Sequence, residues 1–257
     1  MFKITSKESF DIYLEDAKHP FSGWDFSHLK DRIVIAPLFW SYPSVILPFV
    51  RKTKTLLDMG TGGGEFLSTL QPLPEKTFAT EAYKPNVPIA RKKLEPLGVT
   101  VVETDKDENL PFGNEQFELV INRHESYSVK ELLRIIKSSG YFITQQVGGK
   151  NDLELNQKLG AKIDSEELEF LHWDLDYAMK ELEDVGFTII NKLECSPIMR
   201  CFDIGAIVFH LKAIPWQIPD FTIKKYKNKL FELHNEILEK GYFDVTNHRF
   251  LIIAKKE

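Results

Sequence analysis

Four glycines in one short stretch are the residues of this chain whose spacing points most directly to a binding site. The stretch reads Asp58-Met-Gly60-Thr-Gly62-Gly-Gly64-Glu65, and it lies between an apolar run and a helical pattern. Glycines let the backbone turn sharply and let a ligand approach without an obstructing Cβ atom. In an open parallel sheet, ligands bind at the carboxyl ends of the strands, where such turns occur. The stretch therefore predicts a ligand site directly after a strand.

Glu81 supplies a second feature of this site. It lies near the end of the next apolar run, residues 77–83, which is expected to be the neighbouring strand. A carboxylate only accepts hydrogen bonds, and its two oxygens match the two hydroxyls of a diol. Glu81 is therefore placed to bind the ribose of a nucleoside.

A polar cluster, Asn122-Arg123-His124-Glu125-Ser126-Tyr127, follows the apolar run of residues 117–122. His124 is a candidate general base because its charge can change near neutral pH. Glu125 is a second candidate, acting by itself or by orienting His124. The alternative is that His124 only caps the next helix or bonds a backbone carbonyl.

Two residues with amide side chains, Gln145 and Gln146, end the apolar run of residues 141–146. Amides at this edge of a sheet can hydrogen-bond a polar acceptor, or they can hold the following loop in place. Both interpretations stay open for Gln145.

The spacing of the glycines separates two classes of cofactor. A dinucleotide site has the pattern G-x-G-x-x-G/A, with a pyrophosphate at the helix N-terminus. Counted from Gly60, the last position of that pattern is Glu65, whose carboxylate would repel a pyrophosphate. A nicotinamide oxidoreductase is therefore disfavoured.

The observed pattern, D-x-G-x-G-x-G, resembles motif I of the class I S-adenosylmethionine-dependent methyltransferases. Further segments resemble the same family in the same order: Glu81-Ala82-Tyr83 at the ribose and adenine positions, Asp105 at an acidic adenine position with Asp107 nearby, Leu110-Pro111-Phe112, Gln116-Phe117-Glu118-Leu119-Val120, and Ser139-Gly140-Tyr141-Phe142. Glu118 replaces the family's usual aspartate, and Ser139 replaces a glycine. The similarity covers residues 55–147 and resumes weakly at 250–255.

The resemblance implies a methyltransferase whose cofactor is S-adenosylmethionine and whose acceptor is a small molecule. The implied cofactor residues are Asp58, Gly60, Gly62, Gly64, Glu81, Ala82, Asp105 and Asn122. His124 and Glu125 are the implied catalytic residues, and no metal is expected. The implied acceptor residues are Trp24, Tyr42, Arg123, Gln145 and Trp216. An RNA or protein methyltransferase, and a protein that binds the cofactor without turnover, are the alternatives.

These residues need elements that position them, and the apolar runs alternate with helical patterns. Strands are expected at residues 55–59, 77–83, 99–103, 117–122, 141–146, 187–193 and 250–254, and helices at 5–17, 65–70, 87–97, 129–137, 174–185, 203–213 and 223–239. Such alternation predicts an α/β fold with a doubly wound, mostly parallel, seven-stranded sheet.

Residues 1–50 are expected to form an aromatic N-terminal extension, a candidate lid. Residues 51–257 form the methyltransferase domain, with a helical insertion at 194–249 that is a lid or an interface.

Composition and charge narrow the possible partners. The net charge is −5, whereas nucleic-acid binding normally requires a basic face, so a nucleic-acid partner is not expected. The two cysteines, Cys195 and Cys201, fit no disulfide framework and no common zinc spacing. The polar N-terminus resembles no secretory signal, and no apolar run approaches the ~20 residues of a membrane helix, so the cytoplasm is the expected location. The oligomeric state does not follow from the sequence.

Overall fold

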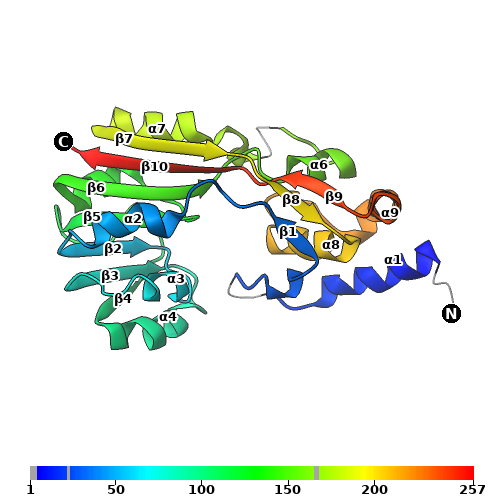
Figure 1. The fold of residues 1–257 in the computed structure, drawn as a ribbon, viewed down its shortest axis with the longest axis horizontal. Coiled ribbons are helices and arrows are strands. Elements are labelled where there is room, and N and C mark those ends of the chain that lie inside the picture. Colours follow the sequence, from blue (N-terminus) through cyan, green and yellow to red (C-terminus); the bar gives the residue numbers. More distant parts are fainter. Residues whose placement is uncertain (1–4, 22–23, 165–167) are drawn as a thin grey trace. The chain divides into compact units, whose positions relative to one another are not determined.

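The computed structural model describes residues 5–21, 24–164 and 168–257, and the chain divides into two compact units. One unit consists of Leu38–Val147, Asp174–Cys195 and Arg249–Glu257. The other consists of Met1–Pro37, Gly148–Trp173 and Ser196–His248. We name them the seven-stranded unit and the three-stranded unit, after their sheets (Figure 1).

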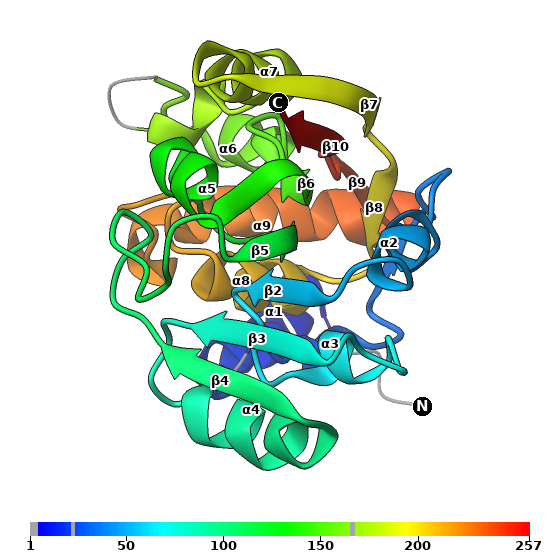
Figure 2. The ribbon, with the colours of Figure 1, turned by 90° about the vertical axis from the view of Figure 1, so that its left-hand side faces the viewer.

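The seven-stranded unit contains the predicted sheet. Its strands are β2 (Thr55–Met59), β3 (Lys76–Glu81), β4 (Val99–Glu103), β5 (Phe117–Arg123), β6 (Ile136–Val147), β7 (Phe187–Cys195) and β10 (Arg249–Lys256). They lie in the order β4-β3-β2-β5-β6-β10-β7 (Figure 2). The pairs from β4 to β6 are parallel, and β10 is antiparallel to both of its neighbours. The predicted doubly wound, mostly parallel sheet is therefore confirmed.

The helices of this unit are α2 (Tyr42–Val50), α3 (Glu65–Ser68), α4 (Val87–Leu94), α5 (Val129–Ile135) and α7 (Leu175–Asp184), with a 3-10 turn at Glu95–Leu97. The central strands are buried, with Leu57, Val120 and Ile143 fully inaccessible to solvent. Continuous apolar runs of this kind are typical of parallel strands covered on both faces. The sequence placed residues 38–50 in the extension, but here α2 packs in the core of the sheet.

The boundary before β6 differs from the expected one. Residues 129–137 were predicted to be helical, but α5 ends at Ile135 and β6 already begins at Ile136. A Cβ atom on Gly140 would lie 3.0 Å from the carbonyl oxygen of Glu118. Atoms of β5 and of β6 itself therefore crowd the Cβ position at residue 140, and glycine avoids this crowding.

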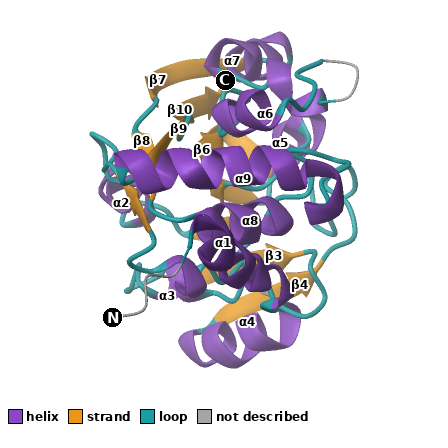
Figure 3. Cartoon of the chain, turned by 90° about the vertical axis from the view of Figure 1, so that its right-hand side faces the viewer, coloured by secondary structure: helices purple, strands orange, loops and turns teal. Residues whose placement is uncertain are grey.

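The three-stranded unit has an antiparallel sheet in the order β1-β8-β9. Its strands are β1 (Ile33–Ile35), β8 (Ile198–Cys201) and β9 (Phe243–Thr246), and its helices are α1 (Ser6–Leu14), α6 (Leu153–Leu159), α8 (Ile204–Ala213) and α9 (Ile223–Lys240), with 3-10 turns at Glu15–Lys18, Ser27–Leu29 and Glu169–His172 (Figure 3). The expected helices at 203–213 and 223–239 are confirmed. Strands β8 and β9 were not predicted.

Helix α9 buries its apolar stripe within its own unit. Tyr226, Leu230, Leu233 and Ile237 are buried and pack in one cluster with residues of α1, α6 and α8. The stripe thus has a covering surface, which the sequence alone could not identify.

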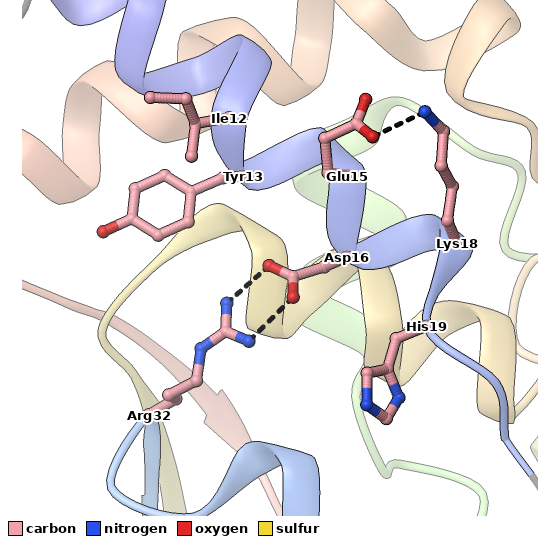
Figure 4. Close-up of a pocket in the computed structure, with 7 residues that line it drawn as sticks. All are labelled: Ile12, Tyr13, Glu15, Asp16, Lys18, His19 and Arg32. Carbon is pink, nitrogen blue, oxygen red and sulfur yellow. Dashed lines mark hydrogen bonds and ion pairs between the residues drawn. The ribbon is translucent and has the colours of Figure 1, made fainter.

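Arg32 connects three segments of the three-stranded unit, and Figure 4 draws its ion pair with Asp16. Its Nη1 and Nη2 donate to the carboxylate of Asp16 at 3.0 and 2.8 Å, and its Nε donates to Asp203 Oδ2 at 2.9 Å. Asp203 also caps α8 by accepting from the backbone N–H of Ala206 at 2.8 Å. The charged side chains beside the open pocket of Figure 4 are therefore largely paired with one another.

In the part of the chain that the structure describes, no helix has both the length and the apolar character that crossing a membrane requires.

Candidate functional site

The glycine turn joins β2 to α3 and contains three left-handed residues. Gly60, Gly62 and Gly64 have φ angles of +69°, +62° and +82°. The N–H of Thr61 donates to the carbonyl of Thr80 in β3 at 2.9 Å, which ties the turn to the neighbouring strand. L-residues with a Cβ atom rarely adopt this conformation, so the chain needs glycine at these positions.

Only one of the three left-handed glycines faces open space. A Cβ atom on Gly60 would lie 2.6 Å from Glu125 Oε2, and a Cβ atom on Gly64 would lie 2.6 Å from Leu94 Cγ. At Gly62, no described atom other than those of the glycine and its two chain neighbours lies within 4 Å of that position. A ligand can therefore approach the backbone closely at Gly62.

Buried carboxylates surround the turn. Glu81 ends β3, is 4% exposed, and accepts a hydrogen bond from the N–H of Tyr83 at 2.8 Å. Asp58 is the penultimate residue of β2 and is also 4% exposed. Burial raises the pKa of Glu81, and it raises the pKa of Asp58 from 3.8 to about 7. Both groups resist ionisation because water is excluded from them.

Glu125 and Asp107 add two further acids. The Glu125 side chain lies against Gly60, and the hydroxyl of Ser126 donates to Asp107. Burial and the negative charge of Asp107 raise the pKa of Glu125, and burial raises the pKa of Asp107. The sequence favoured Asp105 as the acid after β4. Asp107 lies against the loop after β5, where it accepts the hydrogen bond from Ser126. Asp105 is exposed, and so is Ala82, which follows β3.

The loop after β5 is held by a buried network of amides. Asn122, which is fully buried, accepts from Thr144 Oγ1 at 3.0 Å and from Gln146 Nε2 at 2.7 Å, and its Nδ2 donates to the carbonyl of Ser126 at 3.3 Å. Gln146 also donates to the carbonyl of Glu125 at 3.0 Å. These amides thus fix the loop on which the two candidate catalytic residues lie.

His124 lies in this loop with a left-handed backbone, at a φ of +61°, and its N–H donates to the carbonyl of Gln145 at 2.8 Å. The ring Nε2 is 3.1 Å from Gln145 Nε2. The pKa of His124 lies well below its ordinary value, because the surrounding protein desolvates the ring and the guanidinium groups of Arg249 and Arg123 repel its charged form. Among the described residues, Gln145 and not Glu125 is within hydrogen-bond distance of the ring.

The expected acceptor residues fall into two groups. Tyr42 is buried in the seven-stranded unit, where its hydroxyl reaches the carbonyls of Asn122 at 2.9 Å and Ile143 at 3.2 Å. Arg123 is exposed and lies over the ring of Phe66, 5.1 Å from its centroid. Trp24 and Trp216 belong to the three-stranded unit, where their ring centroids are 5.9 Å apart.

Known proteins resemble the chain in sequence and in fold. Residues 57–144 match the model of a family described as a methyltransferase domain. No curated protein sequence matches the chain. Many solved structures share its fold. One is a candidate methyltransferase from Bacillus halodurans, which is 20% identical, with 84% of this chain and 99% of that chain covered and a TM-score of 0.57.

Two other structures extend the comparison. A SAM-dependent methyltransferase from Aquifex aeolicus is 15% identical, with 99% of this chain and 100% of that chain covered and a TM-score of 0.50. A geranyl diphosphate methyltransferase in complex with SAM is 13% identical, with 84% of each chain covered and a TM-score of 0.50.

The matched residues run from β2 to β6 and so contain the glycine turn, Glu81 and the loop after β5. Residues 57–144 thus resemble a methyltransferase domain in sequence, and the protein shares the fold of S-adenosylmethionine-dependent methyltransferases.

Proposed function

We propose that the protein binds S-adenosylmethionine at the glycine turn and transfers its methyl group to a small-molecule acceptor. The observation that carries this proposal is the pairing of an open glycine, Gly62, with the buried carboxylate of Glu81 on the adjacent strand. The backbone at Gly62 admits a ligand, and Glu81 can accept hydrogen bonds from ribose hydroxyls.

The charges around the turn favour this cofactor over a dinucleotide. Asp58, Glu81, Asp107 and Glu125 carry raised pKa values, chiefly because they are buried. A pyrophosphate placed among these acids would be repelled, whereas a sulfonium or ammonium cation would stabilise their ionised forms. Glu65, at the first position of α3, pairs with Lys93 and adds a further carboxylate where a pyrophosphate would lie.

Methyl transfer from this cofactor requires the protein mainly to position the methyl donor and the acceptor. S-adenosylmethionine supplies an activated methyl group, which leaves the sulfonium as the acceptor's lone pair forms a new bond to carbon. The loop after β5 and the network beneath it fix the side chains that would face the acceptor, and fixed geometry of this kind lowers the entropic part of the barrier. His124 and Glu125 are our candidates for contact with the acceptor.

A small-molecule acceptor fits the charge of the protein and one of its structural neighbours. The net charge of −5 disfavours a nucleic-acid acceptor. The neighbour solved with SAM methylates geranyl diphosphate, which is a small molecule. Release of S-adenosylhomocysteine during a screen of small molecules, RNA and protein acceptors tests this choice, and cofactor binding without any turnover would favour a non-catalytic role.

Calorimetry tests the cofactor assignment. We expect S-adenosylmethionine and S-adenosylhomocysteine to bind to the wild type and NADH not to bind. Glu81→Gln keeps the size of the side chain but removes the charge of the ribose acceptor, so affinity should fall by about 1.5–3 kcal/mol, roughly 10- to 150-fold. Binding of NADH alone would overturn the proposal.

Two glycine variants separate the conformational role of Gly62 from its role in binding. Gly62 and Gly98 both have positive φ angles, +62° and +81°, and both have open space at the Cβ position. Gly62→Ala and Gly98→Ala should therefore each lower the free energy of unfolding by about 1–2 kcal/mol. Only Gly62→Ala should also weaken S-adenosylhomocysteine binding by calorimetry; equal affinities in the two folded variants would place the ligand elsewhere.

Asp58 should give the ligand-free protein a distinctive pH dependence. Its pKa is about 7 in the folded state and near 3.8 when the chain is unfolded, so between these values only the folded state holds the proton. This contribution to stability is therefore present in acid and is lost as the pH rises from about 4 to 7. We expect Asp58→Asn to gain stability relative to the wild type between pH 5 and pH 8, measured by urea unfolding. An unchanged difference between the two proteins would refute the shifted pKa.

A further inference from the structure

Hydrogen bonds link Trp40, which lies just before α2, through the side chain of Gln145 to His124 in the loop after β5. The indole Nε1 of Trp40 donates to Gln145 Oε1 at 2.9 Å, and Gln145 Nε2 lies 3.1 Å from His124 Nε2. All three residues belong to the seven-stranded unit. Gln145 is 3% exposed, so its amide depends on these partners in place of water.

The chemistry of the three groups fixes the direction of both hydrogen bonds. An indole N–H can only donate, so the oxygen of the Gln145 amide must face Trp40. The NH2 group of the same amide then faces His124, and it can only donate. The ring nitrogen that meets it must therefore carry a lone pair, which leaves the proton of a neutral imidazole on Nδ1.

The surroundings of the ring agree with a neutral state. A second proton on Nε2 would set an N–H against the NH2 group of Gln145. The nearby charges that act on the ring, Arg123 and Arg249, are both positive. The Glu125 carboxylate faces the backbone N–H and the hydroxyl of Ser126, and among the described residues it makes no hydrogen bond to the ring.

We infer that Trp40 and Gln145 are positioning residues that hold His124 as a neutral Nδ1–H tautomer, so that His124 offers the methyl acceptor a hydrogen-bond donor and not a base. Neighbouring protein atoms crowd the His124 ring, yet the residue keeps an exposed surface, and no hydrogen bond among the described residues reaches its Nδ1. This inference rests on the proposed function for the presence of an acceptor at the loop. It specifies that the acceptor presents a lone pair, on oxygen or nitrogen, to Nδ1–H.

Long-range proton–nitrogen NMR of the ligand-free protein tests the tautomer directly, because the two ring nitrogens report which of them holds a proton. His124→Asn assigns the signals by their loss. In the wild type we expect the proton on Nδ1, with no protonation of the second nitrogen between pH 8 and pH 5. A proton on Nε2, or titration near the ordinary histidine value, would overturn the inference.

Two variants test the positioning residues. Gln145→Glu presents a group that only accepts, so the ring should acquire a proton on Nε2 and the pKa of His124 should rise by about 1–3 pH units. Trp40→Phe removes the donor that orients the amide, so a mixture of tautomers should appear. This variant provides a second test if the glutamate variant does not fold.

Matched controls are available for both changes. Gln116→Glu alters a partly exposed glutamine that accepts from the N–H of Gly113, and Trp216→Phe alters an exposed tryptophan of the other unit. Neither should change the His124 signals; equal effects of Gln145→Glu and Gln116→Glu would contradict the positioning role. Because these spectra need no ligand, failure of the cofactor assignment in calorimetry would leave their result intact.

Discussion

The left-handed turn between β2 and α3 is the constraint on which the site depends. Three residues with positive φ bring the backbone around within five positions, and the Thr61–Thr80 hydrogen bond holds the turn against β3. Glu125 and Leu94 fill the space beside two of these glycines, which leaves Gly62 as the open one. The sheet, the loop after β5 and helix α4 therefore all contribute to a single accessible stretch of backbone.

Burial of acids is the second constraint. Asp58 and Glu81 lie at the ends of adjacent strands, where water is excluded and both pKa values rise. Such groups cost stability in the ligand-free protein at neutral pH and gain a partner when a cation binds. The arrangement differs from that around Arg32, whose two carboxylates are already paired within the fold.

Much of the fold was predictable because its signals are local. Apolar runs that alternate with helical patterns predicted all seven strands of the larger sheet, and the D-x-G-x-G-x-G spacing predicted the turn. Strands β8 and β9 have only four residues each and depend on pairing with distant segments, so no local pattern marks them. The contact between Asp107 and Ser126, and the link from Trp40 to Gln145 across 105 positions, likewise depend on tertiary packing.

The most direct test of the account is a crystal structure of the protein with S-adenosylhomocysteine. We predict ligand density against the backbone at Gly62, with the ribose hydroxyls within hydrogen-bond distance of the Glu81 carboxylate. Density at another place, or a ligand whose ribose lies away from Glu81, would contradict the assignment of the cofactor site.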